Sequence, residues 1–450
     1  MAKYVFIAVL FYTSSLVLAQ ENEADTNRFS LKQAQEYALI HNYTVVNAER
    51  DVSAAKKRVW ETTATGLPQL STEVLFQNFM ELPISLMPAN SFNPNAPEGE
   101  FTELQFGTDY NTTAKISASQ LIFDGTYIVG LQAAKKFKEL SLKTKKKTEE
   151  EIKDGVAQAY HTAIGAIKNY ESLEVSYNSA LTLLNETRVM LQNGIAEEQD
   201  VEQLQLNSSS LENAFNQAKR QVILAQNMLK FQMGMELQEQ LILIDTFGSL
   251  VEMDEESSGL LTNGFQVSNH IDYKLIQTHE QLLKLNYRMV KFAFAPTFSA
   301  FFSHQQQNMN NTFDAFNGGK WYPSTVWGLN LKLPLITSGM RLAKMGQAKI
   351  EYEKAVTNSK QVEQSLILQA QLEQSKYNMA YDTYLTEKEN LALANSIHNK
   401  MIKKYSEGVV TSMEITQSQN QLLYVEGLYK KAIYDLLNAK STLKKALGNE

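Results

Sequence analysis

Apolar and polar positions along the chain form a pattern that occurs twice. Residues 190–234 and 404–448 each predict a helical hairpin, with a turn at Gly194 or Gly408 and then an outgoing helix of about forty residues. In each outgoing helix the apolar residues recur at alternating spacings of three and four. A 3.5-residue period held over this length is typical of a coiled coil. We therefore expect two such hairpins to line a helical conduit that the rest of the chain anchors.

An amphipathic helix precedes each hairpin region. The pattern predicts one helix from Phe29 to about Thr63, with Ser30 as its N-cap, and a second over 265–294. Pro68 and Pro296 follow these two segments and end the helical period.

After each proline the period changes to two, which predicts strands. Residues 70–79 and 114–119 alternate in the first half, and 297–303 and 327–333 alternate in the second. Strands of about ten residues have the length that a tilted membrane strand needs. Residues 83–97 hold half of the eight prolines, which predicts a long exposed loop in place of a continuing strand.

Three glycine pairs set the period of the repeat. Gly125 and Gly339, at the predicted strand-to-helix junctions, are 214 residues apart, and the same interval separates Gly194 from Gly408 and Gly234 from Gly448. We therefore divide the chain into a first repeat over 20–247, an acidic linker over 248–262 and a second repeat over 263–450.

Residues 1–19 predict a cleaved signal peptide. Lys3 precedes an apolar run, and Val17-Leu18-Ala19 resembles a signal-peptidase site. The alternative is a membrane anchor, but the run is shorter than the roughly 20 residues that a span requires. The chain has no cysteine, so an acyl anchor on a lipobox cysteine is excluded, and an exported chain of this kind would enter a membrane through its strands.

Charge and motifs exclude several function classes. The formal net charge of −7 does not indicate a nucleic-acid partner. A lysine cluster over 135–147 is followed at once by Glu149, Glu150 and Glu151, which favours a solvated helix face over a binding patch. The six histidines have no metal-ligand spacing, and no phosphate-binding loop or nucleophile elbow occurs. We expect neither an enzyme nor a cofactor.

Four strands from one chain cannot close a barrel, and open sheet edges are not tolerated in lipid. Two copies would give eight strands and a filled interior, whereas three would give twelve strands and a lumen. A conduit favours three copies. The residues expected to face lipid are Trp327, Leu329, Leu331 and Leu333.

Local motifs at the junctions and turns carry a family resemblance. At the strand-to-helix junctions, the motifs are Gln120–Gly125 and its counterpart in the second repeat, Pro334–Gly339. At the hairpin turns, they are Asn193-Gly194 with Asp200-Val201, and Tyr405–Gly408 with Glu414-Ile415. In this order and spacing the chain resembles the TolC-like outer-membrane efflux protein family over nearly its whole mature length. The resemblance implies a mainly helical fold with a membrane β-barrel: a homotrimer of four strands per chain in a 12-stranded barrel, with a helical periplasmic tunnel.

The resemblance also implies a location, partners and a gate. The location is the outer membrane of a Gram-negative bacterium, with docking to a periplasmic adaptor and an inner-membrane pump of RND or ABC type. Asp200 and Tyr405 match an inter-helix contact that holds such tunnels closed, Glu414 matches an acidic constriction, and Gln417 stands where a second acidic residue is common. The alternative for both carboxylates is a helix-dipole role at the start of a helix.

The function that we expect is a passive exit duct for small molecules. A duct for secreted polypeptides in a type I system has the same architecture, and the sequence does not separate the two. A secreted coiled-coil scaffold without a pore is the alternative from another class. Its strands would need a covering partner over Trp327 and its apolar neighbours. An exported enzyme is disfavoured because no site is present.

Overall fold

The computed structural model describes residues 27–448 apart from 96, 256–264 and 314–318. The expected signal peptide (1–19) and the linker residues 256–262 therefore lie outside the described residues. The part of the linker that is described belongs to a helix, α5 (Phe247–Glu255).

The chain forms two compact units, and each draws on both halves of the sequence. The first takes its residues from Met1–Asn42, Gly155–Ser258 and Tyr381–Asn438, and the second from Tyr43–Asp154, Gly259–Ala380 and Ala439–Glu450. These units are assembled across the halves, so they do not test the division into two sequence repeats, which stays a prediction.

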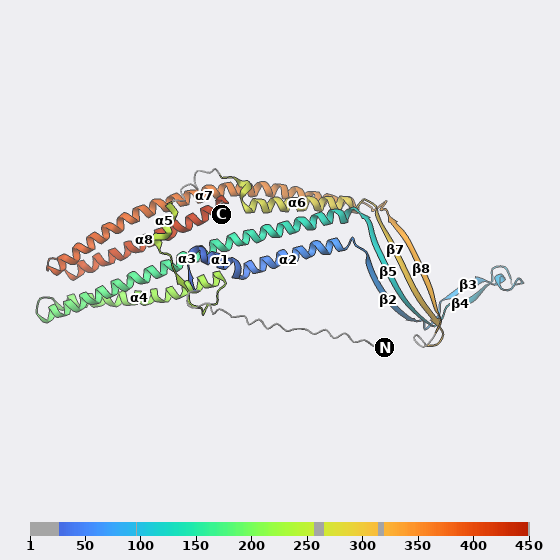
Figure 1. Ribbon diagram of the computed structural model, residues 1–450, viewed down its shortest axis with the longest axis horizontal. Helices are drawn as coiled ribbons and strands as arrows, with labels where there is room; N and C mark the ends of the chain where they lie inside the picture. The colour runs from blue at the N-terminus through green and yellow to red at the C-terminus, as the bar shows by residue number, and fades with distance from the viewer. Residues whose placement is uncertain (1–26, 96, 256–264, 314–318, 449–450) are drawn as a thin grey trace, which may run out of the picture. The chain divides into compact units, whose positions relative to one another are not determined.

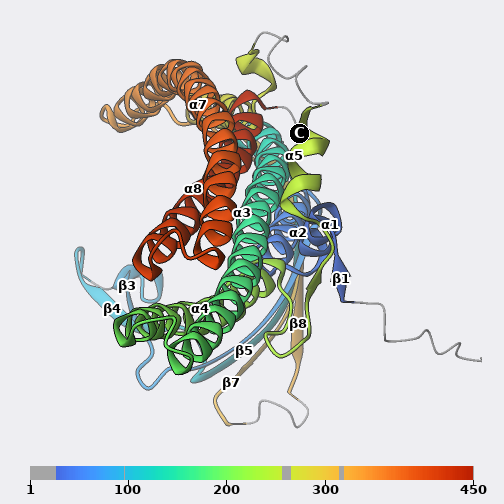
Figure 2. The ribbon, with the colours of Figure 1, turned by 90° about the vertical axis from the view of Figure 1, so that its left-hand side faces the viewer.

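Two long helical hairpins dominate the chain. The first consists of α3 (Gly125–Gln192) and α4 (Glu198–Met233), and the second of α7 (Met340–Ser406) and α8 (Ser412–Leu447). α3 and α7 have 68 and 67 residues, and α4 and α8 have 36 each. Figure 2 shows the hairpins end-on, with α4 beside α3 and α8 beside α7. The coiled-coil period therefore corresponds to helices of matched length in the two halves.

The first amphipathic segment is two helices, and the expectation of one continuous helix is wrong. α1 (Leu31–His41) has Ser30 as its N-cap in a capping box with Gln33, and α2 (Tyr43–Ala64) follows after an extended residue, Asn42. The Asn42 side chain donates a 2.8 Å hydrogen bond to the carbonyl oxygen of Gln232 near the end of α4. This tertiary contact fixes the break, which the helical period of the sequence does not reveal.

The second amphipathic helix also starts later than its pattern predicts. α6 spans Ile271–Phe292, and a short 3₁₀ turn, η3 (Val267–Asn269), precedes it. His270 is the N-cap, and its ring nitrogen accepts a 3.2 Å hydrogen bond from the backbone N–H of Asp272. A cap at residue 270 excludes the preceding residues from the helix.

A four-stranded antiparallel sheet lies within the second unit. Its order is β2–β5–β7–β8, and its strands are β2 (Gln69–Asn78), β5 (Tyr110–Asp124), β7 (Thr297–Asn310) and β8 (Trp321–Lys332). The strands run side by side in Figure 1. All four predicted strands are present, and β5, β7 and β8 extend beyond the predicted segments.

The register gives the sheet two different faces, because directly opposed residues of antiparallel strands share a face. One row of the first face holds Leu70, Ala118, Phe302 and Trp327. A row of the other face holds Glu73, Lys115, Gln305 and Ser324. The apolar character of the first face is strongest toward the ends of the strands nearest the helices and becomes mixed at the row of His304 and Thr325.

The proline-rich segment contains regular structure, so the expectation of a plain loop is wrong. β3 (Ile84–Pro88) pairs with β4 (Phe101–Gln105) as a two-stranded ribbon, and η1 (Ala89–Ser91) follows β3. Proline is tolerated here because the outer edge of a two-stranded ribbon requires no further hydrogen bonds. The ribbon lies between β2 and β5 along the chain (Figure 1).

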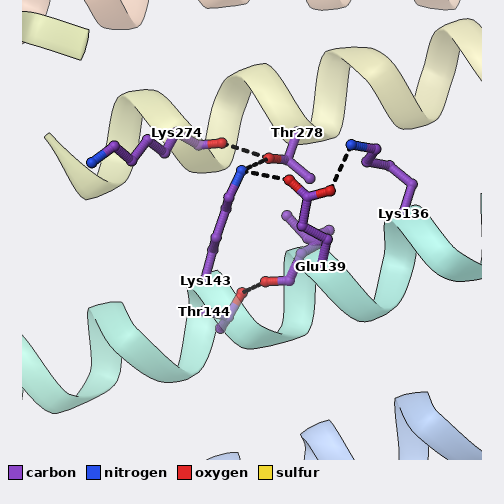
Figure 3. A network of polar contacts seen from close by, with 7 residues as sticks. Lys136, Glu139, Lys143, Thr144, Lys274 and Thr278 are labelled. Carbon is purple, nitrogen blue, oxygen red and sulfur yellow. Dashed lines mark hydrogen bonds and ion pairs between the residues drawn. The ribbon is translucent and has the colours of Figure 1, made fainter. Parts of the chain in front are cut away.

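The lysine cluster of α3 is paired with neighbouring helices of the second unit. Lys143 donates a 2.6 Å hydrogen bond to the Thr278 hydroxyl of α6 and contacts Glu139 at 2.8 Å, as Figure 3 shows. Lys147 contacts Asp272 of α6 at 2.7 Å, and Lys145 forms an ion pair with Glu49 of α2. These lysines therefore connect three helices at a partly solvated surface.

Candidate functional site

The Asp200 carboxylate connects the two hairpins near their turns. Its Oδ1 accepts a 2.5 Å hydrogen bond from the hydroxyl of Ser412, the first residue of α8. Its Oδ2 accepts a 3.2 Å hydrogen bond from the backbone N–H of Glu197 and so caps its own helix, α4. One carboxylate thus supplies both the inter-hairpin contact and the helix-start role that the sequence left open.

Tyr405 connects the same hairpins through another partner. Its hydroxyl lies 3.0 Å from the Thr187 hydroxyl of α3, and Thr187 is fully buried. Asp200 and Tyr405 therefore each contact the opposite hairpin, but Asp200 bonds Ser412 and Tyr405 bonds Thr187. Neither partner was selected from the sequence, because a serine or threonine in a helix carries no recognisable pattern of its own.

A buried amide pair lies one heptad beyond Asp200 and Ser412. The Asn207 side chain donates a 3.3 Å hydrogen bond to Gln419 Oε1, and Gln419 Nε2 donates one of 3.3 Å to the backbone carbonyl of Ser176. Thr416 lies between Ser412 and Gln419 on the same face of α8. Its buried hydroxyl has no hydrogen-bond partner among the described residues.

Further polar contacts continue along the two hairpins. Lys430 of α8 donates a 2.6 Å hydrogen bond to Ser172 Oγ, and the His161 ring nitrogen Nδ1 lies 3.1 Å from Asn438 Oδ1. We name the whole set the polar seam. Its members are His161, Ser172, Ser176, Thr187, Asp200, Asn207, Tyr405, Ser412, Thr416, Gln419, Lys430 and Asn438.

The polar seam differs from the interior of each hairpin. Leu184 of α3 and Leu204 of α4 are each 1% exposed, and together with Leu211 and Leu229 they belong to an apolar core. Separating an apolar interface exposes carbon to water, whereas separating polar groups lets water replace their partners. The seam is therefore the contact between hairpins that opens at the lower cost.

Glu414 and Gln417 lie on the exposed face of α8. The Glu414 carboxylate accepts hydrogen bonds from the backbone N–H and the hydroxyl of Thr411, at 2.8 and 3.0 Å. These bonds lower the pKa of Glu414, the backbone bond contributing most. Within one chain, the Glu414 side chain therefore caps the N-terminus of α8. No contact of the Gln417 side chain is seen among the described residues.

The predicted turn glycines adopt left-handed backbone angles. Gly194 has φ 72° and Gly408 has φ 70°, and a Cβ at either would meet no other atom within 4 Å. Glycine is favoured there by conformation and not by space. At the end of α4 both reasons apply, because Gly234 has φ 77° and an added Cβ would lie 2.4 Å from the His41 carbonyl oxygen.

The two junction glycines differ from one another. Gly125 begins α3, and an added Cβ would lie 2.7 Å from Phe292 Cδ1, so a close helix approach requires glycine. Gly339 precedes α7 with φ 80° and open space around it. One junction is therefore constrained by packing and the other by backbone conformation.

The strand residues expected to face lipid lie on the apolar face of the sheet. Trp327, Leu329 and Leu331 belong to β8, and Leu333 lies one residue beyond its end. Their side chains are between 54% and 75% exposed in the single chain. Such a large exposed apolar area requires an apolar environment or a partner.

Among the described residues, no group of histidine, cysteine and carboxylate side chains is arranged to hold a metal ion. None of the described helices combines the length and the apolar character needed to cross a bilayer.

Residues 280–449, from within α6 to the end of α8, match the family model described as Outer membrane efflux protein. Most of the second half of the chain therefore resembles outer membrane efflux proteins in sequence. This match agrees, over the segment that it covers, with the resemblance predicted from the sequence. No curated protein matches the sequence.

Solved structures of outer-membrane channels share the fold. CusC is 16% identical with a TM-score of 0.70, over 93% of this chain and 92% of CusC. The CmeC outer membrane channel of Campylobacter jejuni is 15% identical with a TM-score of 0.65, over 99% of this chain and 94% of its own. VceC of Vibrio cholerae is 15% identical with a TM-score of 0.63, over 93% and 96%. The predicted fold class is therefore confirmed over nearly the whole chain.

Proposed function

We propose that three copies of this chain close a twelve-stranded barrel and form a passive exit duct for small molecules. The duct receives its substrate from an inner-membrane pump of RND or ABC type, joined to it by a periplasmic adaptor. No chemistry occurs in the duct, because the energy comes from the pump.

The sheet is the observation that carries this proposal. Its edge strands β2 and β8 each pair on one side only within the described residues. One face is apolar toward the ends of the strands nearest the helices, while the other holds the polar row of Glu73 and Lys115. Open edges must pair with another strand before a sheet enters lipid. Three copies place β8 of each chain beside β2 of the next, with the apolar face toward lipid and the polar row of Glu73 and Lys115 toward the lumen.

The polar seam supports a gate at the hairpin turns. Contacts through Asp200 and Tyr405 hold the two hairpins of one chain together at the end where an adaptor would dock. Opening the duct separates the hairpins along the seam, and water replaces the lost hydrogen bonds. Three Glu414 side chains around the trimer axis form an acidic ring that attracts cations. In that ring, mutual repulsion opposes the lowering of the Glu414 pKa by Thr411.

The test starts with the full-length protein extracted from outer membranes in detergent. Light scattering and unheated electrophoresis should give a trimer that heating converts to monomers, and the trimer should conduct ions in planar bilayers. A monomer or dimer in the soluble periplasmic fraction would overturn the duct. A trimer that never conducts, even after the seam is broken by substitution, would overturn the gate.

A further inference from the structure

A cavity of about 690 Å³ lies within the first unit, and Lys430 of the polar seam is among its lining residues. Its walls come from α3, α5, α7 and α8, so both hairpins contribute to it. The volume falls within the roughly 300–1,000 Å³ range of small-molecule sites in proteins. Two residues of the polar seam, Ser172 and Lys430, line this cavity, but neither the duct nor the gate assigns a ligand to it.

The cavity carries an excess of positive charge. Three lysines and two glutamates line it. Lys168 pairs with Glu171 at 2.6 Å, and Lys430 lies 3.4 Å from Glu426. The third, Lys388, has no carboxylate partner among the described residues, and its ammonium lies 5.7 Å from the centre of the Tyr384 ring. Within the part of the chain that the structure describes, the exposed ammonium of Lys388 therefore has no carboxylate as counter-charge.

Aromatic and aliphatic side chains form the remaining walls. The rings of Tyr384 and Tyr429 are stacked with their centres 6.0 Å apart, and Phe247, Val251 and Leu391 also line the cavity. Stacked rings present a flat surface that suits another aromatic ring. Burial lowers the pKa of Lys430, the sign expected for an ammonium that lacks full compensation.

We propose that this cavity binds a small organic anion that has an aromatic body. The anionic head lies against Lys388 and Lys430, and the ring packs on the Tyr384–Tyr429 pair. A neutral analogue keeps the ring contact and loses the charge interaction. A cation is disfavoured by the same excess charge.

A ligand bound in the cavity would also favour the arrangement in which the two hairpins are in contact. Ser172 of α3 and Lys430 of α8 face the cavity and bond to each other across the polar seam. A ligand that contacts both hairpins binds best when they are together, and it therefore stabilises the closed seam. This consequence rests on the proposed gate, whereas the binding itself does not.

Calorimetry of the full-length trimer in amphipol tests the site with two probes, naphthalene-2-sulfonate and the neutral 2-naphthylmethanol. We expect saturable binding of the sulfonate, with one site per chain and an affinity at least tenfold above that of the alcohol. Lys388→Met should lower sulfonate affinity about tenfold, because it keeps the aliphatic stem and removes the charge. Lys360→Met is the control, since Lys360 is an exposed lysine of α7 outside the cavity.

Equal affinity for the two probes, or an unchanged affinity in Lys388→Met, would overturn the proposal. A second variant, Tyr384→Leu, removes part of the aromatic wall and should lower the affinity for both probes. Unchanged affinity for both would show that they do not bind in this cavity and would also overturn the proposal. Electrophoresis of each variant without heating verifies that the trimer is intact. Calorimetry measures ligand binding whether or not the protein conducts ions. A negative binding result is therefore distinct from a negative result for the proposed duct. Sulfonate binding with unaltered bilayer conductance would overturn the link to the seam alone.

Discussion

Asn207 and Gln419 lie 3.3 Å apart between α4 and α8, one heptad beyond the 2.5 Å contact of Asp200 with Ser412. The two hydrogen bonds therefore occupy equivalent turns of the same helix pair. Repetition at seven residues is the spacing at which two coiled helices meet again. The hairpins are thus joined along a line of polar contacts.

Breaking this line should open the duct. Ser412→Ala and Gln419→Ala together remove both contacts, each worth about 1–3 kcal/mol where a buried partner is left unsatisfied. We expect the open probability in planar bilayers to rise at least tenfold. Single-channel recordings of the trimer measure this change.

Glu414→Gln is the matched comparison, because Glu414 lies on the exposed face of α8 and, among the described residues, its side chain accepts hydrogen bonds from Thr411 at the start of its own helix. It should leave the seam intact and alter cation block more than open probability. If Glu414→Gln opened the channel and the seam variant did not, the gate would reside in the acidic ring.

Thr416→Val should close the duct more firmly. The buried hydroxyl of Thr416 has no partner among the described residues, and valine keeps its shape while removing the unpaired group. We expect about 1 kcal/mol of added stability for the closed seam and a lower open probability. Thr386→Val is the control, since that exposed hydroxyl bonds the Asp382 carbonyl of its own helix. A higher open probability in Thr416→Val would contradict the assignment.

His398 should make the second hairpin sensitive to acid. It bonds Ser418 at 3.0 Å, while Leu184 and Leu204 stand 214 residues earlier at the corresponding positions of the first hairpin. Burial lowers the pKa of His398 below 6.5. The unfolded state then binds more protons, so stability is lost as the pH falls below about 6.5.

Hydrogen exchange over 395–420 at pH 7.5 and 5.5 measures this effect without interference from His270, whose pKa burial also lowers. The double variant His398→Leu with Ser418→Leu recreates the leucine pair of the first hairpin. It should abolish the difference between the two pH values. A difference that survives in the double variant would exclude His398 as its source.

Gly234→Ala should destabilise the fold far more than Gly194→Ala. Both residues have positive φ, which costs an alanine about 1–2 kcal/mol. At Gly234 the new Cβ would also lie 2.4 Å from the His41 carbonyl oxygen, and the backbone of α1 must then move. Thermal unfolding midpoints of the two variants compare the effects. Equal midpoints would show that α1 does not pack tightly against the end of α4.

Much of the architecture could be predicted from local sequence. Hydrophobic period, proline positions and the 214-residue glycine interval identify the hairpins and the four strands, because helix and strand periods depend on near neighbours. The same information predicted a continuous first helix and a plain proline-rich loop, and both predictions are wrong. Asn42 breaks the helix through a bond to Gln232, and β3 and β4 pair across the loop.

The sequence by itself determined the period, the turns and the order of elements. Only the tertiary structure decided that Asp200 contacts Ser412, that Tyr405 contacts Thr187, and that Lys388 lines a cavity with no carboxylate partner among the described residues. Each of these pairs joins residues more than 200 positions apart, or depends on four helices at once. A contact at such separation is set by how whole helices pack, and the residues involved carry no local signal of it.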